Sequence, residues 1–205
     1  MKNIPQRIIR YIYLCQMISF NKIFKNSLIL TAITLVLFFG LYFYFSTNGN
    51  VSVKDYYTYS FMICCFILLP VYAIYCFFMI FNLSKKKAIN YQTREDLMSF
   101  KEGFKVGFYT IFFAGAMSLI VIFLFFNTAG EWAQDSLKQG LLDTFTDNMA
   151  DPKIAKDIEL YRNSDGYKNL NLFTIKNFFG LFSMFLSFYI AISALFSQFL
   201  KKRVF

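Results

Sequence analysis

Few side chains in this 205-residue sequence have the types and spacing that chemistry requires. The chain has no His, and its four cysteines lie in apolar or amphipathic surroundings without CxxC spacing. Metal centres use His, Cys and carboxylate ligands at characteristic spacings, so we expect no metal site and no bound cofactor. The cysteines are more simply interpreted as small buried hydrophobic residues. They are Cys15, Cys64, Cys65 and Cys76.

Two carboxylate pairs have a spacing that general acid and base catalysis could use, namely Asp143 with Asp147 and Asp157 with Glu159. A catalytic pair also needs an enclosed pocket and a group that positions or attacks the substrate. The surrounding sequence supplies neither, so a solvated helix face is the simpler interpretation. There is also no phosphate-binding loop, dinucleotide fingerprint or nucleophile elbow. We therefore expect that the protein is not an enzyme.

Long apolar stretches dominate the sequence instead. Residues 106–126 include no charge, and as an α-helix they would extend for roughly 31 Å, about the thickness of a bilayer's hydrocarbon core. With 57% hydrophobic and only 16% charged residues, the chain has more apolar surface than one soluble domain can bury. We predict an all-α polytopic membrane protein with four transmembrane helices. They are residues 27–46, 57–81, 106–126 and 178–200.

These stretches divide the chain into four parts. Residues 1–26 form a basic amphipathic segment, which we expect to lie along the inner membrane surface unless translation begins at Met17. Residues 27–126 hold the first three transmembrane helices. Residues 127–177 form an extracytoplasmic amphipathic helical segment. Residues 178–205 hold the fourth transmembrane helix and a basic tail.

Lys and Arg residues are unevenly distributed between the two sides of the predicted membrane. Fourteen of the 21 lie in the N-terminal segment, in the loop between the second and third spans and in the tail. Because cytoplasmic loops carry the excess of positive charge, we predict a multi-pass protein of the bacterial inner membrane with both termini in the cytoplasm. The net charge of +9 flanks apolar spans, so we expect no nucleic-acid partner. The residues expected to set orientation and to meet anionic lipid head groups are Lys85, Lys86, Lys87, Lys201, Lys202 and Arg203.

Polar features inside the predicted spans have two interpretations each. Pro70 predicts a kink that leaves the carbonyl of Phe66 without its helical hydrogen bond. In one interpretation the kink acts as a hinge, or the free carbonyl faces a ligand. In the other, the kink is a packing feature and a neighbouring helix bonds the carbonyl. Ser and Thr residues along the spans either line a path for a polar substrate or bond within the bundle. No predicted span contains an ionisable Asp, Glu, Lys or Arg, which argues against an ion-coupled transporter.

Small residues recur at helical spacing on the third and fourth predicted spans. Such stripes let helix backbones approach closely in lipid, where no hydrophobic effect drives helices together. We predict that the two stripes meet, either within one chain or across a dimer. The third-span stripe consists of Gly103, Gly107, Ala114 and Ser118, and the fourth-span stripe of Gly180, Ser183, Ser187, Ala191 and Ala194.

Two local signals predict where helices begin. Ser99 followed by Glu102 is a capping-box pattern, which predicts a helix that begins in water and continues into the third span. Asp151 followed by Pro152 is typical of an N-cap and first helical residue.

The polar segment of residues 127–177 is predicted to form two short amphipathic helices. It is too small and too poor in apolar residues to fold alone, so we expect these helices to lie on the membrane surface or on a partner. Trp132 fits an interfacial anchor. The apolar residues that share one face of the first helix are Leu137, Leu141, Leu142, Phe145 and Met149.

The order of these features resembles a known family. The features are a hairpin of spans, a lysine cluster, an acidic amphipathic segment, the third-span entry SFKEGFKVGF and the last span NFFGLFSMFLSFYIAISALFSQFLKKR. Together they resemble the four-helix inner-membrane proteins of Bacteroidota grouped as domain of unknown function 4199, over residues 17–203. The resemblance implies a membrane location and brings neither an activity nor functional residues.

Three classes of function fit these observations. The first is a non-catalytic accessory or scaffold subunit of a bacterial envelope membrane complex, whose partners are the lipid bilayer and another membrane protein or a second copy of the chain. The second is a small transporter or channel subunit, which should show a polar cavity. The third is an accessory factor in envelope lipid or glycan synthesis, whose basic inner face would gather anionic lipids.

Overall fold

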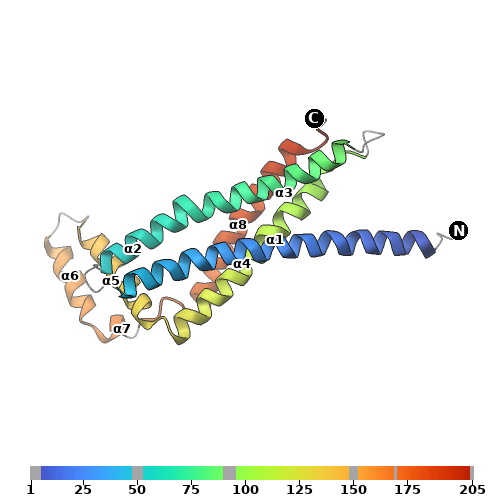
Figure 1. The fold of residues 1–205 in the computed structure, drawn as a ribbon. Coiled ribbons are helices and arrows are strands. Elements are labelled where there is room, and N and C mark those ends of the chain that lie inside the picture. The colour runs from blue at the N-terminus through green and yellow to red at the C-terminus, as the bar shows by residue number, and fades with distance from the viewer. Residues whose placement is uncertain (1–5, 48–52, 90–95, 148–151, 169, 204–205) are drawn as a thin grey trace. The chain divides into compact units, whose positions relative to one another are not determined.

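The fold is helical throughout the part of the chain that the structure describes. The structure is a computed structural model that describes residues 6–47, 53–89, 96–147, 152–168 and 170–203. The helices, labelled in Figure 1, are α1 (Gln6–Thr47), α2 (Val53–Met62), α3 (Leu69–Ile89), α4 (Phe100–Thr128), α5 (Glu131–Asp147), α6 (Pro152–Arg162), α7 (Asp165–Lys168) and α8 (Ile175–Leu200), with a π-helical segment, Ile63–Leu68, between α2 and α3.

Four helical stretches are long and apolar enough to cross a membrane, which confirms the predicted all-α polytopic fold. Their side chains mostly point outward, since at most 28% of the most apolar window of any span is buried within the chain. Large apolar residues such as Val36 and Phe66 are 71% and 74% exposed. Such surfaces are suited to contact with lipid. The stretches are Phe20–Thr47, Lys54–Ile89, Phe100–Thr128 and Ile175–Leu200.

The chain divides into two compact units, and each span contributes to both. The first unit consists of Met1–Ile33, Tyr72–Met117 and Phe185–Phe205. The second unit consists of Thr34–Val71 and Ser118–Met184.

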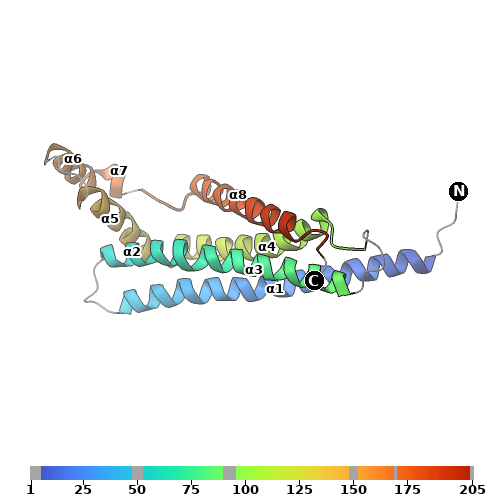
Figure 2. The same cartoon turned by 90° about the horizontal axis from the view of Figure 1, so that it is seen from above.

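The first span begins earlier than the sequence predicts. One continuous helix, α1, runs from Gln6 to Thr47, so no break separates the basic segment from the apolar stretch at residue 26. Figures 1 and 2 both show the first turns of α1 extending past the beginning of α4. Residues 6–26 therefore continue the helix of the first span, and the position of this segment relative to the membrane surface stays a prediction.

The second span changes its helical form just before Pro70. The N–H of Leu69 donates to the carbonyl of Cys64, five residues back, and Ile63–Leu68 is π-helical. Proline lacks the N–H that an α-helix would use at this position, so an interrupted hydrogen-bond ladder is the expected consequence. The sequence predicts the site of the irregularity, and the structure gives its form. Pro70 itself is exposed.

The second unit has an aromatic core close to the ends of the first three spans. Its buried members are Phe45, Tyr56, Phe126 and Ala133, with Tyr56 only 1% exposed. The rings of Phe45 and Tyr56 lie 5.7 Å apart, which places the end of α1 beside α2 as a hairpin of spans requires. The ring of Trp132 packs edge-on against Tyr42 and at a tilt against Tyr56. Trp132 therefore joins α5 to the spans.

The polar segment folds into α5, α6 and α7, and α5 packs along α2 (Figures 1 and 2). The buried face of α5 carries the small residues Ala133, Ser136 and Gly140, which allow this close contact. Helix α6 begins at Pro152 as predicted. Met149 and the proposed N-cap Asp151 lie outside the described residues. Of the predicted apolar face, Leu137, Leu141 and Leu142 are half-buried, and Phe145 is exposed.

Charged side chains support the polar helices within α5 and between α5 and α6. Arg162 of α6 bonds to Asp143 of α5 at 2.5 Å, and Lys138 bonds to Asp135 of its own helix at 2.6 Å. Lys138 is only 8% exposed and lies over the ring of Tyr167, 5.8 Å from its centroid. Burial raises the pKa of the Tyr167 phenol, so the ring stays neutral at physiological pH. These contacts anchor the α6–α7 region to α5 through charge rather than through an apolar core.

We predict that Ala133→Leu destabilises the second unit because Ala133 is completely buried between α5 and its neighbours. Overpacking of this kind costs about 1–3 kcal/mol. Titration with a denaturing detergent, followed by circular dichroism, should show earlier unfolding. Gln139→Leu, on the exposed face of the same helix, is the matched control and should unfold like the wild type. Equal unfolding curves for the two variants would show that the α5 contact carries no stability.

Candidate functional site

The close packing of α3, α4 and α8 in the first unit depends on glycines in α4. A Cβ atom on Gly107 would lie 2.6 Å from Ile80 Cδ1 and 2.9 Å from Cys76 Sγ, both on α3. A Cβ atom on Gly103 would lie 3.1 Å from Ser197 Oγ on α8 and 3.3 Å from Ile80 Cγ2. Any larger residue would push the neighbouring side chains aside. We call this three-helix contact the seam.

The seam continues at Gly115, where a tyrosine fills the space that a side chain would need. A Cβ atom on Gly115 would lie 2.7 Å from the Cζ atom of Tyr189 on α8. The ring of Tyr189 stacks on Tyr72 of α3, with centroids 5.6 Å apart. A planar ring cannot bend out of the way as an aliphatic chain can. Gly115 is therefore the most demanding position of the seam.

Polar groups join α3 to α8 along the same contact. Cys76 Sγ lies 3.6 Å from Ser193 Oγ, and Ser84 Oγ donates to the carbonyl of Leu200 at 2.9 Å. Cys76 and Ser193 are fully buried, and Ser84 is 1% exposed. Hydrogen bonds between helices replace the hydrophobic drive that lipid does not supply. The buried face of α8 therefore consists of Tyr189, Ser193, Ser197 and Leu200.

Hydroxyl groups also join α1 to α4. Ser27 Oγ donates to the carbonyl of Thr110 at 2.8 Å, and Thr31 Oγ1 donates to the carbonyl of Ala114 at 3.3 Å. Both pairs advance by four residues together, so the two helices run in the same direction. Ser27 and Thr110 are fully buried. Hydroxyls in this setting serve helix packing, which is the second of the two interpretations given above for Ser and Thr.

The structure places the two predicted small-residue stripes in different environments. All four members of the third-span stripe, Gly103, Gly107, Ala114 and Ser118, are buried. The fourth-span stripe lies away from the seam. No atom lies within 4 Å of a Cβ built on Gly180, and Ser183, Ser187 and Ala191 are exposed, while Ala194 is half-buried.

The structure does not bury the fourth-span stripe against the third-span stripe. The glycines of α4 face α3 and the opposite, Tyr189-bearing side of α8. Sequence spacing identified the correct helix face on α4 and missed the packed face of α8. The missed signal is a repeat of buried residues every four positions on both helices. On α3 these are Tyr72, Cys76, Ile80 and Ser84, and on α8 they are Tyr189, Ser193 and Ser197. A meeting of the stripes across two chains stays a prediction.

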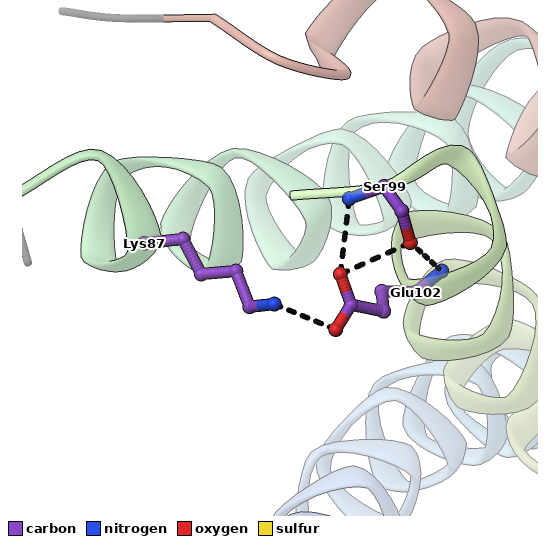
Figure 3. A network of polar contacts seen from close by, with 3 residues as sticks. All are labelled: Lys87, Ser99 and Glu102. Carbon is purple, nitrogen blue, oxygen red and sulfur yellow. Dashed lines mark hydrogen bonds and ion pairs between the residues drawn. The ribbon is translucent and has the colours of Figure 1, made fainter. Parts of the chain in front are cut away.

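The predicted capping box is present at the start of α4 and extends into an ion pair (Figure 3). The backbone N–H of Ser99 donates to Glu102 Oε2 at 3.0 Å, and the N–H of Glu102 donates to Ser99 Oγ at 3.3 Å. The other carboxylate oxygen of Glu102 accepts from Lys87 Nζ at 2.6 Å. The prediction of the capping box is confirmed. Its extension to Lys87 ties the end of α3 to the beginning of α4.

The ends of α3 and α8 lie together with the beginning of α4, and we call this region the basic end of the first unit. The bond from Ser84 to Leu200 joins α3 to α8, and the N–H of Lys202 donates to the carbonyl of Met98 at 3.0 Å. The orientation residues predicted from the sequence gather here. Lys87 is half-buried, and the exposed ones are Lys85, Lys86, Lys201, Lys202 and Arg203.

Comparison with known proteins assigns the chain to a family. A family profile described as "Protein of unknown function (DUF4199)" matches residues 25–202. The chain belongs to the DUF4199 family. No curated protein and no solved structure matches it. The match covers all four spans of this DUF4199 protein from residue 25 onward, and it includes the seam and the basic end up to Lys202.

The seam and the basic end of this DUF4199 chain differ in what they expose. The seam is filled by side chains, and the basic end presents exposed ammonium groups. Among the described residues, Lys138 is the one buried charged side chain, and it lies in α5 outside the spans. The stripe of α8, apart from the half-buried Ala194, and five cations of the basic end are exposed.

We predict that Gly115→Ala destabilises the first unit because the new methyl group overlaps the ring of Tyr189. A strained core insertion costs about 1–3 kcal/mol. Gly180→Ala is the matched control: its methyl group meets no atom within 4 Å, and alanine favours a helix by about 1 kcal/mol over glycine. Unfolding in a denaturing detergent should occur earlier for Gly115→Ala and no earlier for Gly180→Ala. The reverse order would contradict the seam.

We also predict that two substitutions of Glu102 separate the cap from the ion pair. Glu102→Ala removes both and should cost about 1–2 kcal/mol, whereas Glu102→Gln keeps a capping side chain and loses only a partly exposed pair worth about 0–1 kcal/mol. The measurement is the free energy of unfolding of each variant at low and high salt. The wild type should approach Glu102→Gln in high salt because salt screens the pair. Equal costs for the two variants would show that the carboxylate charge alone matters.

Proposed function

We propose that this DUF4199 protein is a non-catalytic accessory or scaffold subunit of a membrane complex in the bacterial inner membrane, and that it docks to another membrane protein through α8. The observation that carries this proposal is the exposed small-residue stripe of α8. Small residues exposed to lipid give little contact area, yet they permit a close approach of another helix. The stripe on α4 already fulfils this role within the chain.

The burial of the four spans supports the same conclusion. In α8, 11% of the most apolar window is buried, against 17–28% in the other three spans. This span is therefore the least covered by its own chain. A partner helix on the stripe side would leave the seam intact, because the seam uses the side of α8 that carries Tyr189 and Ser193.

The distribution of charge supports the proposed orientation. The ends of α3 and α8 and the start of α4 carry the basic cluster, and the bonds of the basic end keep these three ends together. Positive residues are retained on the cytoplasmic side of a membrane. This side is therefore the cytoplasm in our proposal, and the helices α5–α7 lie outside it, with the exposed side chains of Phe145, Leu160 and Tyr161 available to the membrane surface or a partner.

We expect the tagged full-length chain, expressed at its native level and solubilised in a mild detergent, to co-purify with a stoichiometric membrane partner. Ser187→Ile should reduce the recovered partner about ten-fold or more, because a bulky side chain in a close helix contact costs about 1–3 kcal/mol. Mass spectrometry of the purified complex measures the ratio of the two chains.

Leu181→Phe is the control for this experiment. It also adds bulk to an exposed position of α8, but it lies about a third of a turn away from the stripe. It should leave the partner bound. Recovery of the chain alone, recovery only of its own oligomer, or equal loss in both variants would each contradict the proposed docking through α8.

A further inference from the structure

The exposed lysines of the basic end come from three helices that two hydrogen bonds hold together. Lys85 directly follows Ser84, whose hydroxyl donates to Leu200, and Lys201 directly follows Leu200. Consecutive Cα atoms lie about 3.8 Å apart, so these two lysines begin close to that bond. Lys202 is fixed by its own N–H to Met98, just before α4.

Lys101 adds a fourth ammonium group from the first turn of α4. It is exposed, as are Lys85, Lys201 and Lys202, and none of the four forms an ion pair with another residue of the described chain. The acid of this region, Glu102, is already bound by Lys87 and Ser99. Asp96 also has an interaction of its own. The positive charge of the four lysines is therefore not neutralised by these carboxylates.

The backbone of Lys202 adopts a conformation that residues other than glycine rarely use. Its φ angle is 51°, in the left-handed region, where glycine or asparagine usually ends a helix. In this conformation the Cβ atom of a lysine comes close to the following carbonyl oxygen, which is unfavourable. Lys202 is the second residue after the end of α8. The bond from its N–H to Met98 holds its backbone where the ends of α3 and α8 meet the beginning of α4.

Apolar side chains flank the four lysines on the surface. Phe199 at the end of α8 is 60% exposed, Ile89 at the end of α3 is 73% exposed, and Phe100 at the start of α4 is 41% exposed. The charge-free stretch of the third span begins nearby, at Val106. Phe199 precedes Lys201 and lies on the apolar side of the basic end, whereas Ile89 follows Lys85 and Phe100 precedes Lys101, so both lie farther from the apolar stretches than these lysines. The surface thus combines cations at the ends of the spans with an exposed aromatic ring at the end of the apolar stretch of α8. This pairing matches a ligand that has both an anionic head group and acyl chains.

We propose that the basic end binds the head-group phosphate of an anionic phospholipid through Lys85, Lys101, Lys201 and Lys202, with the acyl chains against Phe199 and its apolar neighbours. This binding site is independent of the α8 stripe and of any protein partner. A lipid in this position bridges the ends of α3, α4 and α8. It adds a third connection to the two hydrogen bonds already present, from Ser84 to Leu200 and from Lys202 to Met98.

Native mass spectrometry of the purified full-length chain in a neutral detergent tests this proposal, with phosphatidylglycerol and phosphatidylcholine as the probes. Phosphatidylglycerol should bind at least ten-fold more tightly. One lysine near an anionic lipid contributes roughly a five-fold factor in affinity, so Lys201→Gln with Lys202→Gln should weaken phosphatidylglycerol binding about 25-fold. Phosphatidylcholine binding should change little.

The double substitution Lys156→Gln with Lys176→Gln is the matched control, since it removes two exposed lysines of the second unit. It should bind phosphatidylglycerol like the wild type. Lys85→Gln with Lys101→Gln provides a second test should the tail variant fail to fold, and it should also lose affinity. Equal binding of the two lipids, equal losses in control and test variants, or full displacement of the lipid by excess inorganic phosphate would overturn the proposal.

Discussion

The close approach of α4 to α3 and α8 at glycine positions is the constraint on which the first unit depends. In lipid, apolar surface gains nothing by moving from one hydrocarbon environment to another, so association of helices relies on dispersion contacts and interhelical hydrogen bonds. Gly107 and Gly115 bring the backbone of α4 near enough for both. The buried bonds between Cys76 and Ser193, and from Ser84 to Leu200, then become geometrically possible. The converging charged ends of the same helices are a consequence of this packing.

Sequence reasoning succeeds here wherever the determining interactions are local. Whether an uncharged apolar stretch can cross a bilayer depends on its own length and composition, and not on its neighbours. All four spans are predictable for this reason. The reciprocal bonds of Ser99 and Glu102 connect residues three apart, so their pattern is visible in the sequence. Pro70 likewise marks the irregularity of its own helix. The π-helical form of Ile63–Leu68 was not predictable, because the position of the displaced hydrogen bonds depends on the whole second span.

Contacts between residues far apart in the sequence determine the features that sequence reasoning missed. Helix α8 carries two faces with small polar residues, and spacing alone cannot decide which one packs within the chain. Tyr189 decides it, because its ring needs the gap that Gly115 leaves on another helix. On α5 the small residues Ala133, Ser136 and Gly140 are buried, since the neighbouring helix approaches closely there, while Leu137 packs only partly buried against the aromatic core. The ion pair of Lys87 with Glu102 could not be predicted from the sequence either, because it depends on how the end of α3 meets the beginning of α4.

The hydroxyl bonds between α1 and α4 differ in kind from the packing of the glycines. Each hydroxyl has a single proton, yet Ser27 Oγ has acceptors at 2.8 Å on Thr110 and at 2.9 Å on Ile23 of its own helix. Thr31 Oγ1 has the same choice between Ala114 and Ser27. If α1 moved away, each proton could return to its own helix and no donor would be stranded in hydrocarbon. The interhelical hydrogen bonds of α1 can thus be exchanged for bonds within α1. Separating α1 from α4, or inserting α1 into the membrane before it packs on α4, therefore costs little free energy from unsatisfied hydrogen bonds.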